Sequence, residues 1–476
     1  MSPADLTLTE QAAALAAGRI SSRELVEDSL ARISRWQPLV NAWVEVYAEQ
    51  ARAAADRADR ARGGRAALGP LHGVPLAHKD MFHRPGRRPG MGSRVPMPGD
   101  GTPSTLLERL SAAGAFDVAA LNMAEFALGP TGHNAHTGAA RNPWNTSHVS
   151  GGSSSGGGVA VATRTVAASV GSDTGGSVRL PAGATGVLGL KPTYGRITRA
   201  GMMPLSPSVD VPGLFARSVP DLALVLRIVA GHDDRDPASS RRPVPDYSRV
   251  LGAGISRLRI GLPTQPAFLP VDPGVARAFE TAVATLAGLG AEVVPVTLPA
   301  PEPLAELSRT LVYAEAWSIH RDWMRGHADG YTPQVRVRAA TGLGIPDAAY
   351  TEAQRLRPAL LRRYVGEVHS RCDVLMLPTL SIEVPTLAET DVGGGASMWT
   401  KIAAMVPCTA PFNYLGLPAL AVPCGFGVTG LPVSFQLAGR PFDEATLLRV
   451  ADAYQRATDW HQRAPSPETA AIAASS

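Results

Sequence analysis

Two glycine- and serine-rich turns hold the residues best suited to chemistry. The first runs from Ser150 to Gly158, and the second runs from Gly171 to Arg179. Between them lie a window of small residues and an apolar segment, which predict a helix followed by a strand. Glycine lets the backbone bend sharply and approach a ligand closely. Such turns bring backbone N–H groups together, as an oxyanion requires, and a hydroxyl among them is a candidate nucleophile.

Three interpretations of these turns compete. A flexible linker is disfavoured because both turns flank apolar elements. A phosphate loop is disfavoured because the run lacks G-x-x-x-x-G-K-[ST] and no lysine follows it. A serine nucleophile remains, although not in a G-x-S-x-G elbow, since Arg179 stands where the last glycine should be. A Ser-His-Asp triad is not excluded, because His320, His369 and His461 lie downstream of the turns. Their settings, however, favour helix or surface positions over a catalytic one.

Lysine is unusually rare in this chain. Of 45 Lys and Arg residues, only Lys79, Lys191 and Lys401 are lysine. A guanidinium stays protonated, whereas a buried ammonium can lose its proton. Lys79 follows the apolar run 73–78, and α/β folds place catalytic groups at the carboxyl ends of strands. Because burial there would lower its pKa, we expect Lys79 to be the base that activates a serine.

Composition narrows the class of protein. The chain has 476 residues, 45% hydrophobic and 18% charged, which suits a globular enzyme with a large core. We find no apolar run long enough for a membrane span and no signal peptide in residues 1–10. The net charge of +4 is spread without a basic run, which argues against a nucleic acid partner. Three cysteines make no disulfide framework, so we expect a cytoplasmic protein.

The segments around the turns alternate between helix-like and strand-like patterns. Residues 1–70 look helical, with capping boxes that begin at Thr7 and Ser21. Beyond residue 70, short apolar runs alternate with helical windows, which predicts an α/β sheet covered by helices. The expected strands are 73–78, 118–121, 165–170, 258–262, 292–298, 374–377, 420–422 and 433–437. The expected helices are 104–113, 220–230, 273–289, 303–324, 352–370 and 443–456.

Together these features resemble the amidase signature family. The match covers about residues 5–460 and rests on a highly specific set of stretches. They are Gly73–Asp80, Asn122–Phe126, Arg141–Trp144, Gly151–Ser177, Lys191–Arg196, Pro418–Gly425 and Gly430–Gly439. The resemblance implies a large central mixed β-sheet covered by helices on both faces. We expect one domain over 1–476, with a helical segment at about 1–70, a core at about 71–230 and a substrate-side, C-terminal part at about 250–460.

The resemblance implies a role for several residues of the turns. Ser177 would attack the carbonyl carbon. Ser153, expected after a cis peptide bond from Gly152, would pass the proton to neutral Lys79. The oxyanion would be held by the backbone N–H groups of Thr174, Gly175, Gly176 and Ser177. Water would then release the acyl group by the same relay, and the family mechanism uses no metal and no other cofactor.

Other polar residues near the motifs receive structural roles. Asp173 and Arg179 would brace the second turn. Lys191 lies in a stretch typical of the family and is expected to be structural, whereas Lys401 is expected to be a loop residue. Three histidines between residues 72 and 83 lie close together, but their spacing does not fit a metal site.

The run Thr409–Pro418 bears on the substrate. It resembles a T-x-P-F-N-x-x-G-x-P run of the family's glutamine-using subunits, which usually carry an aspartate seven residues before the asparagine to bind glutamine's α-amino group. Here that position, counted back from Asn413, is Val406, and its neighbours are apolar. An ammonium bound there would lack a partner. We therefore expect a small neutral amide, anilide, carbamate, hydrazide or ester, contacted by Val406 and Met123.

The alternative function is a glutamine-hydrolysing A subunit of an aminoacyl-tRNA amidotransferase. The expected partners are a small amide substrate and water, with no nucleic acid and no membrane, and a homodimer is left open. Specificity is expected from loops at 305–345 and 380–410.

Overall fold

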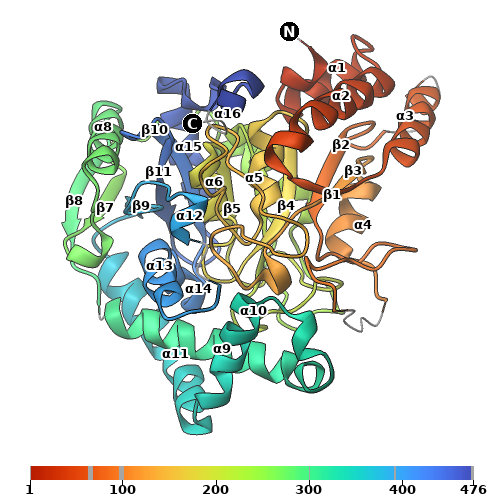
Figure 1. Cartoon of the computed structure of the whole chain (residues 1–476). Coiled ribbons are helices and arrows are strands. Elements are labelled where there is room, and N and C mark those ends of the chain that lie inside the picture. Colours follow the sequence, from red (N-terminus) through yellow and green to blue (C-terminus); the bar gives the residue numbers. More distant parts are fainter. Residues whose placement is uncertain (1, 63–67, 96–100, 300, 391–392, 473–476) are drawn as a thin grey trace.

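One large sheet runs through the chain, with helices around it (Figure 1). The computed structural model describes residues 2–62, 68–95, 101–299, 301–390 and 393–472. The sheet has 11 strands in the order β1-β3-β2-β4-β6-β5-β10-β11-β9-β7-β8. Parallel pairs such as β2 and β4 stand beside antiparallel pairs such as β4 and β6, so the sheet is mixed, as expected. The strands are β1 Trp43–Val46, β2 Pro75–Lys79, β3 Phe116–Leu121, β4 Ala168–Asp173, β5 Leu188–Lys191, β6 Val211–Ala216, β7 Arg259–Pro263, β8 Glu292–Val296, β9 Val374–Pro378, β10 Ala419–Phe426 and β11 Pro432–Ala438.

Helices cover both faces of the sheet, because alternate residues of a strand point to opposite sides. In β6, Leu214 and Ala216 pack into the same apolar cluster as Leu222 of α7. Phe215, between them, packs into a second cluster with Val159 of α5 and residues of α6. The helices are α1 Leu8–Ala16, α2 Ser22–Val40, α3 Ala48–Arg62, α4 Thr105–Ala112, α5 Ser155–Ala162, α6 Arg179–Thr185, α7 Val219–Val229, α8 Pro273–Gly288, α9 Pro301–His327, α10 Pro333–Ala340, α11 Asp347–Val368, α12 Leu387–Thr390, α13 Ser397–Met405, α14 Ala410–Tyr414, α15 Glu444–Ala457 and α16 Pro467–Ile472.

The expected capping boxes are confirmed at the starts of α1 and α2. Thr7 N–H donates to Glu10 Oε2 at 2.8 Å, and the Glu10 N–H returns to the Thr7 hydroxyl. Ser21 and Glu24 repeat the exchange at α2. All the expected strands and helices beyond residue 70 are also present, with bounds shifted by a few residues.

Two expectations about the substrate side are wrong. The segment 305–345 is no loop, because α9 and α10 fill most of it, and 380–410 contains α12 and α13. In Figure 1, α9, α10 and α11 gather at one end of the sheet. Lys401 is likewise no loop residue: it lies within α13, with its side chain exposed. The helix expected at 303–324 corresponds to α9, whereas α10, α12 and α13 were not predicted.

Within the described ranges, no helix has both the length and the apolar character needed to cross a bilayer. All three cysteines are buried and unpaired.

Candidate active site

Lys79 ends β2 beneath the nucleophile turn, and its side chain is wholly buried. Its Nζ lies 2.8 Å from Ser153 Oγ and 2.9 Å from Ser172 Oγ. Burial lowers the pKa of Lys79 from 10.5 to about 7, although the negative charges of Asp210 and Asp173 oppose this shift. Near neutral pH, therefore, a large fraction of this amine is unprotonated and can accept a proton from a hydroxyl.

The two turns meet through their backbones. The Gly152–Ser153 peptide bond is cis, as the resemblance implied. Gly152 must be glycine, because a Cβ there would lie 2.5 Å from the carbonyl oxygen of Gly129. The Ser154 N–H donates to the Ser177 carbonyl at 3.1 Å, which joins the first turn to the second. Hydrogen bonds thus join the three separate segments that carry Lys79, Ser153 and Ser177.

Ser177 lines a small cavity, whereas Lys79 and Ser153 are fully buried and are not among its lining residues. The cavity has a volume of about 70 Å³. Its lining is mostly apolar, with backbone from both turns: Ala127, Leu128, Gly129, Pro130, Thr174, Gly175, Ser177, Leu180, Leu205, Val312, Arg338 and Val406. Val406 lines the same cavity as Ser177, and its contact with a substrate stays a prediction. Met123 is not among these lining residues and packs instead in the hydrophobic core.

The nucleophile turn is braced by Asp173 and Arg179. Arg179 Nη2 and Asp173 Oδ1 form an ion pair at 2.9 Å, and both side chains are fully buried. Burial alone would raise the pKa of Asp173, but the Arg179 charge and hydrogen bonds hold it well below its usual range. Arg179 also donates to the Thr409 carbonyl, and Asn413 Nδ2 donates to Asp173 Oδ1 at 2.8 Å. The Thr409–Pro418 run thus supports the turn that carries the nucleophile.

The expected oxyanion donors divide into two groups. The Gly176 N–H already donates to Asp173 Oδ1 at 2.9 Å, so it is engaged in this structure, and its service to the oxyanion stays a prediction. The N–H groups of Thr174, Gly175 and Ser177 make no hydrogen bond within the described part of the chain. Thr409 Oγ1 donates to the Gly175 carbonyl at 2.7 Å and so holds that peptide in place. These three amides remain as donors for developing negative charge.

Arg338, which the sequence did not single out, is a charged side chain in the cavity lining. It lies on α10 and is 7% exposed. Its Nη1 donates to the Leu128 carbonyl at 2.9 Å, and its Nη2 donates to the Tyr313 hydroxyl at 3.1 Å. Its Nε has no partner, and it forms no ion pair with a carboxylate of the described residues. Within the described ranges, the guanidinium is therefore a buried cation without a counter-charge.

The downstream histidines lie away from the cavity. His320 is buried in α9, where its Nδ1 lies 3.0 Å from the Tyr331 hydroxyl. His369 caps the end of α11, and neither it nor His461 lines the cavity. The structure thus favours Lys79 over a histidine as base. Among the residues described, no group of three or more His, Cys, Asp or Glu side chains is arranged to hold a metal ion.

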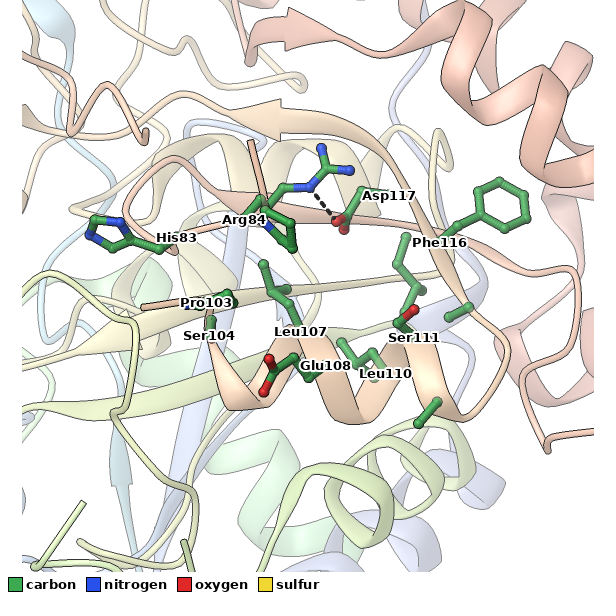
Figure 2. A pocket seen from close by; sticks show the side chains of 14 residues that line it. His83, Arg84, Pro103, Ser104, Leu107, Glu108, Leu110, Ser111, Phe116 and Asp117 are labelled. Atoms are coloured by element: carbon green, nitrogen blue, oxygen red, sulfur yellow. Dashed lines mark ion pairs between the residues drawn. The ribbon is translucent and has the colours of Figure 1, made fainter. Parts of the chain in front are cut away.

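A larger pocket of about 590 Å³ lies between α4 and strands β2 and β3 (Figure 2). Arg84 and Asp117 form an ion pair at its edge, with 3.2 Å between Nε and Oδ2. None of the residues around Ser177 lines it. The predicted nucleophile, Ser177, lines the smaller cavity.

Comparisons with known proteins agree on the family. The amidase family model matches residues 24–448. The chain is 42% identical to the A subunit of glutamyl-tRNA(Gln) amidotransferase from Chloroflexus aggregans, over 97% of this chain and 98% of that protein. It is 34% identical, with a TM-score of 0.87 over 95% and 98% of the two chains, to a protein solved in a vestigial complex that reveals the origins of an s-triazine catabolic enzyme. It is 28% identical to 6-aminohexanoate cyclic dimer hydrolase, with a TM-score of 0.85 over 98% and 99%.

Proposed function

This chain belongs to the amidase signature family, and is thus a hydrolase of carbon–nitrogen bonds; we propose that it cleaves the amide bond of a small substrate that carries a carboxylate. The observation behind the carboxylate is Arg338, the unpaired buried cation in the cavity. The proposal keeps the expected acyl-enzyme chemistry and changes the expected substrate from neutral to anionic.

The reaction begins when Ser177 Oγ attacks the carbonyl carbon. Its proton passes to Ser153 Oγ, whose own proton passes to Lys79 Nζ, 2.8 Å away. The N–H groups of Thr174, Gly175 and Ser177 stabilise the oxyanion. Return of the proton to the amide nitrogen breaks the C–N bond and leaves an acyl ester on Ser177. Water then attacks this ester, gives its proton to the same relay, and frees the acid.

Arg338 supports an anionic substrate for an energetic reason. A buried charge without a counter-charge destabilises the folded state, and a bound anion removes that penalty. The guanidinium presents several donors in one plane, which suits a carboxylate. Among the described residues, only two neutral oxygens accept from it, and Nε remains free. The apolar lining from Leu180, Leu205 and Val312 would contact the aliphatic part of the substrate.

The relatives that match over their full length favour the alternative, glutamine hydrolysis in the A chain of an amidotransferase. Glutamine also carries a carboxylate, so Arg338 fits both interpretations. The difference lies in the α-ammonium, because no aspartate or glutamate lines the described cavity and Val406 stands where an acid would be needed. An ammonium there would stay unpaired unless a partner protein or a structural change supplied an anion.

Three amides of equal chain length separate these interpretations. Glutamine carries the carboxylate and the ammonium, glutaramate carries only the carboxylate, and valeramide carries neither. We expect ammonia release by the purified chain to be fastest with glutaramate. Faster release from valeramide would overturn the role of Arg338, and a preference for glutamine would establish the amidotransferase interpretation.

Two variants on one helix complete this test. Arg338→Met should raise KM for glutaramate by roughly 10-fold or more, the range for a charge-assisted hydrogen bond, and leave valeramide hydrolysis nearly unchanged. Arg336→Met is the matched control, because Arg336 also lies on α10 but its side chain is 45% exposed. Equal effects of the two substitutions would count against a carboxylate site.

A further inference from the structure

A second buried aspartate stands beside the catalytic turn. Asp210 directly precedes β6 and is 2% exposed. Since β6 pairs with β4 so that Val211 opposes Asp173, Asp210 lies next to Thr174 at the end of β4. The Thr174 hydroxyl donates to Asp210 Oδ1 at 2.7 Å. The backbone N–H groups of Leu205 and Ser206 donate to Oδ2 at 2.8 and 2.9 Å.

Asp210 differs from Asp173 in how its charge is compensated. Asp173 has Arg179 as its ion-pair partner. Asp210 forms no ion pair with a cation of the described residues, and its hydrogen-bond donors are all uncharged. Burial raises the pKa of Asp210, and these three hydrogen bonds oppose that shift. Because two of the donors are backbone N–H groups that can only donate, they favour the ionised carboxylate. Asp210 therefore holds a negative charge that no neighbouring cation in the described part of the chain neutralises by contact.

The sheet brings this charge near the catalytic lysine. Lys79 Nζ contacts Ser172 Oγ, and Ser172 lies two residues before Thr174 on the strand that β6 pairs with. Of the charged groups around the site, Arg338 lines the cavity together with Thr174 and has no ion-pair partner among the described residues. The remaining ones are paired. Asp173 is paired with Arg179, and Arg199, whose charge reaches Asp210, is paired with Asp236 at 2.7 Å.

We propose that Asp210 is a positioning residue for the reaction, which fixes Thr174 for the oxyanion and provides the counter-charge for the ammonium that forms on Lys79. This inference rests on the catalytic roles proposed above. When Ser177 forms its bond to the carbonyl carbon, one proton moves from Ser177 to Ser153 and one from Ser153 to Lys79. The lysine becomes positive while the carbonyl oxygen becomes negative. Asp210 stabilises the first charge through space and the second through its bond to Thr174.

A substrate-independent assay tests this inference. The rate at which a fluorophosphonate labels Ser177 is measured against pH, with the site of labelling located by mass spectrometry. Asp210→Asn should slow labelling at the plateau by about 10²-fold, the lower end for general acid–base catalysis. The acid limb of the pH profile is the range in which the labelling rate falls as Lys79 becomes protonated. In Asp210→Asn this limb should move to lower pH by about one unit or more, because loss of a nearby anion disfavours the ammonium. An unmoved limb, or one moved to higher pH, overturns the counter-charge.

Two further variants separate position from charge. Thr174→Val keeps the Asp210 charge and removes the contact, so labelling should slow by roughly tenfold with the acid limb in place. Unchanged labelling in Thr174→Val overturns the positioning part, even if Asp210→Asn does not fold. Asp221→Asn is the matched control, because Asp221 is also fully buried and accepts from a threonine N–H and hydroxyl, but at α1 and α7. Its acid limb should match that of the wild type.

The outcomes also separate this inference from the proposed function. If the wild-type chain is labelled at a serine other than Ser177, the proposed mechanism fails and this inference fails with it. If Ser177 is labelled with an acid limb that Asp210→Asn leaves unchanged, the mechanism stands and the role of Asp210 is refuted.

Discussion

Two buried lysines end strands of the same sheet, Lys79 at the end of β2 and Lys191 at the end of β5. Burial lowers the pKa of both amines from 10.5 to about 7. Their contacts differ. Lys79 Nζ touches two serine hydroxyls, whereas Lys191 Nζ donates to the carbonyl of Pro192 at 3.1 Å. A carbonyl has no proton to give, so of these two lysines only Lys79 stands at the end of a chain of hydroxyls.

The charges around the two amines differ as well. Asp210 and Asp173 act on Lys79, and both favour its ammonium. Lys191 lies near Arg179 and Arg357, which disfavour its ammonium, as well as near acidic groups that favour it. A lowered pKa therefore allows a lysine to lose its proton near neutral pH. To act as a base in the reaction, the lysine also needs a hydroxyl that can give it a proton and a nearby negative charge that stabilises the ammonium. The predictions below test this difference, from the largest expected effect to the smallest.

Removal of the nucleophile should have the largest effect. Ser177→Ala deletes only the hydroxyl oxygen that attacks the carbonyl carbon, so turnover should fall to the background rate while the fold persists. Initial rates with the preferred amide and a thermal unfolding curve check this. A fluorophosphonate should label wild-type Ser177 and leave the variant unlabelled. Labelling of another serine in the wild type would sink the assignment.

The next largest effect should come from Lys79→Arg. Arginine stays protonated at any working pH and cannot accept the proton. The rate should fall on the order of 10²- to 10⁴-fold, the range for general acid–base catalysis. Lys79→Met should lose a similar factor, because it removes the amine while keeping the length of the side chain. Near wild-type rates in Lys79→Arg would show that a positive charge suffices there, and the serine–serine–lysine mechanism would have to be abandoned.

The acid limb of the pH–rate profile should report Lys79. Its pKa in the folded chain is lowered to about 7, so the neutral, active form dominates above pH 7 and is lost below it. We expect kcat/KM to rise with pH through about 7 and to fall about tenfold per unit below about pH 6, as for one essential base. Profiles between pH 5 and 9 check this. Activity that is constant down to about pH 5 would contradict a lysine base.

The strands that the sequence failed to predict are β1, β5 and β6. β1 and β5 have four residues each, too short for an alternation to emerge. β6 contains Pro212 and Gly213, which usually interrupt strands. In the structure, these residues pair with Ser172 and Gly171 of β4. The sheet imposes the extended form there, against local preference.

The reacting residues were predictable for chemical reasons, whereas their supporting residues were not. Lys79 stood out because lysine is rare, and Ser153 and Ser177 stood out by their glycine-rich turns. Arg338 lies in a Val-Arg-Val-Arg run among many arginines, and only folding reveals that it lacks an anion among the described residues. Asp210 belongs to no motif that the sequence could reveal. Its position next to Thr174 arises only because β6 pairs with β4. The capture of the Gly176 N–H by Asp173 is also a matter of three-dimensional geometry.

The smallest effect should come from Lys191→Met, which removes the other buried amine. Methionine has nearly the same length and carries no charge, so it avoids the desolvation of an ammonium beside Arg179. Among the described residues, the amine has one hydrogen bond to lose, the one to the Pro192 carbonyl. We expect kcat/KM within about threefold of the wild type and a melting temperature that holds or rises, since buried cations often stabilise less than apolar residues of the same volume.

Lys401→Arg on the exposed side of α13 is the reference for a substitution with no effect at all. A loss in Lys191→Met as large as that in Lys79→Met would mean that burial, rather than contact with hydroxyls, distinguishes the catalytic lysine, and that the proton path extends across the sheet from β2 to β5.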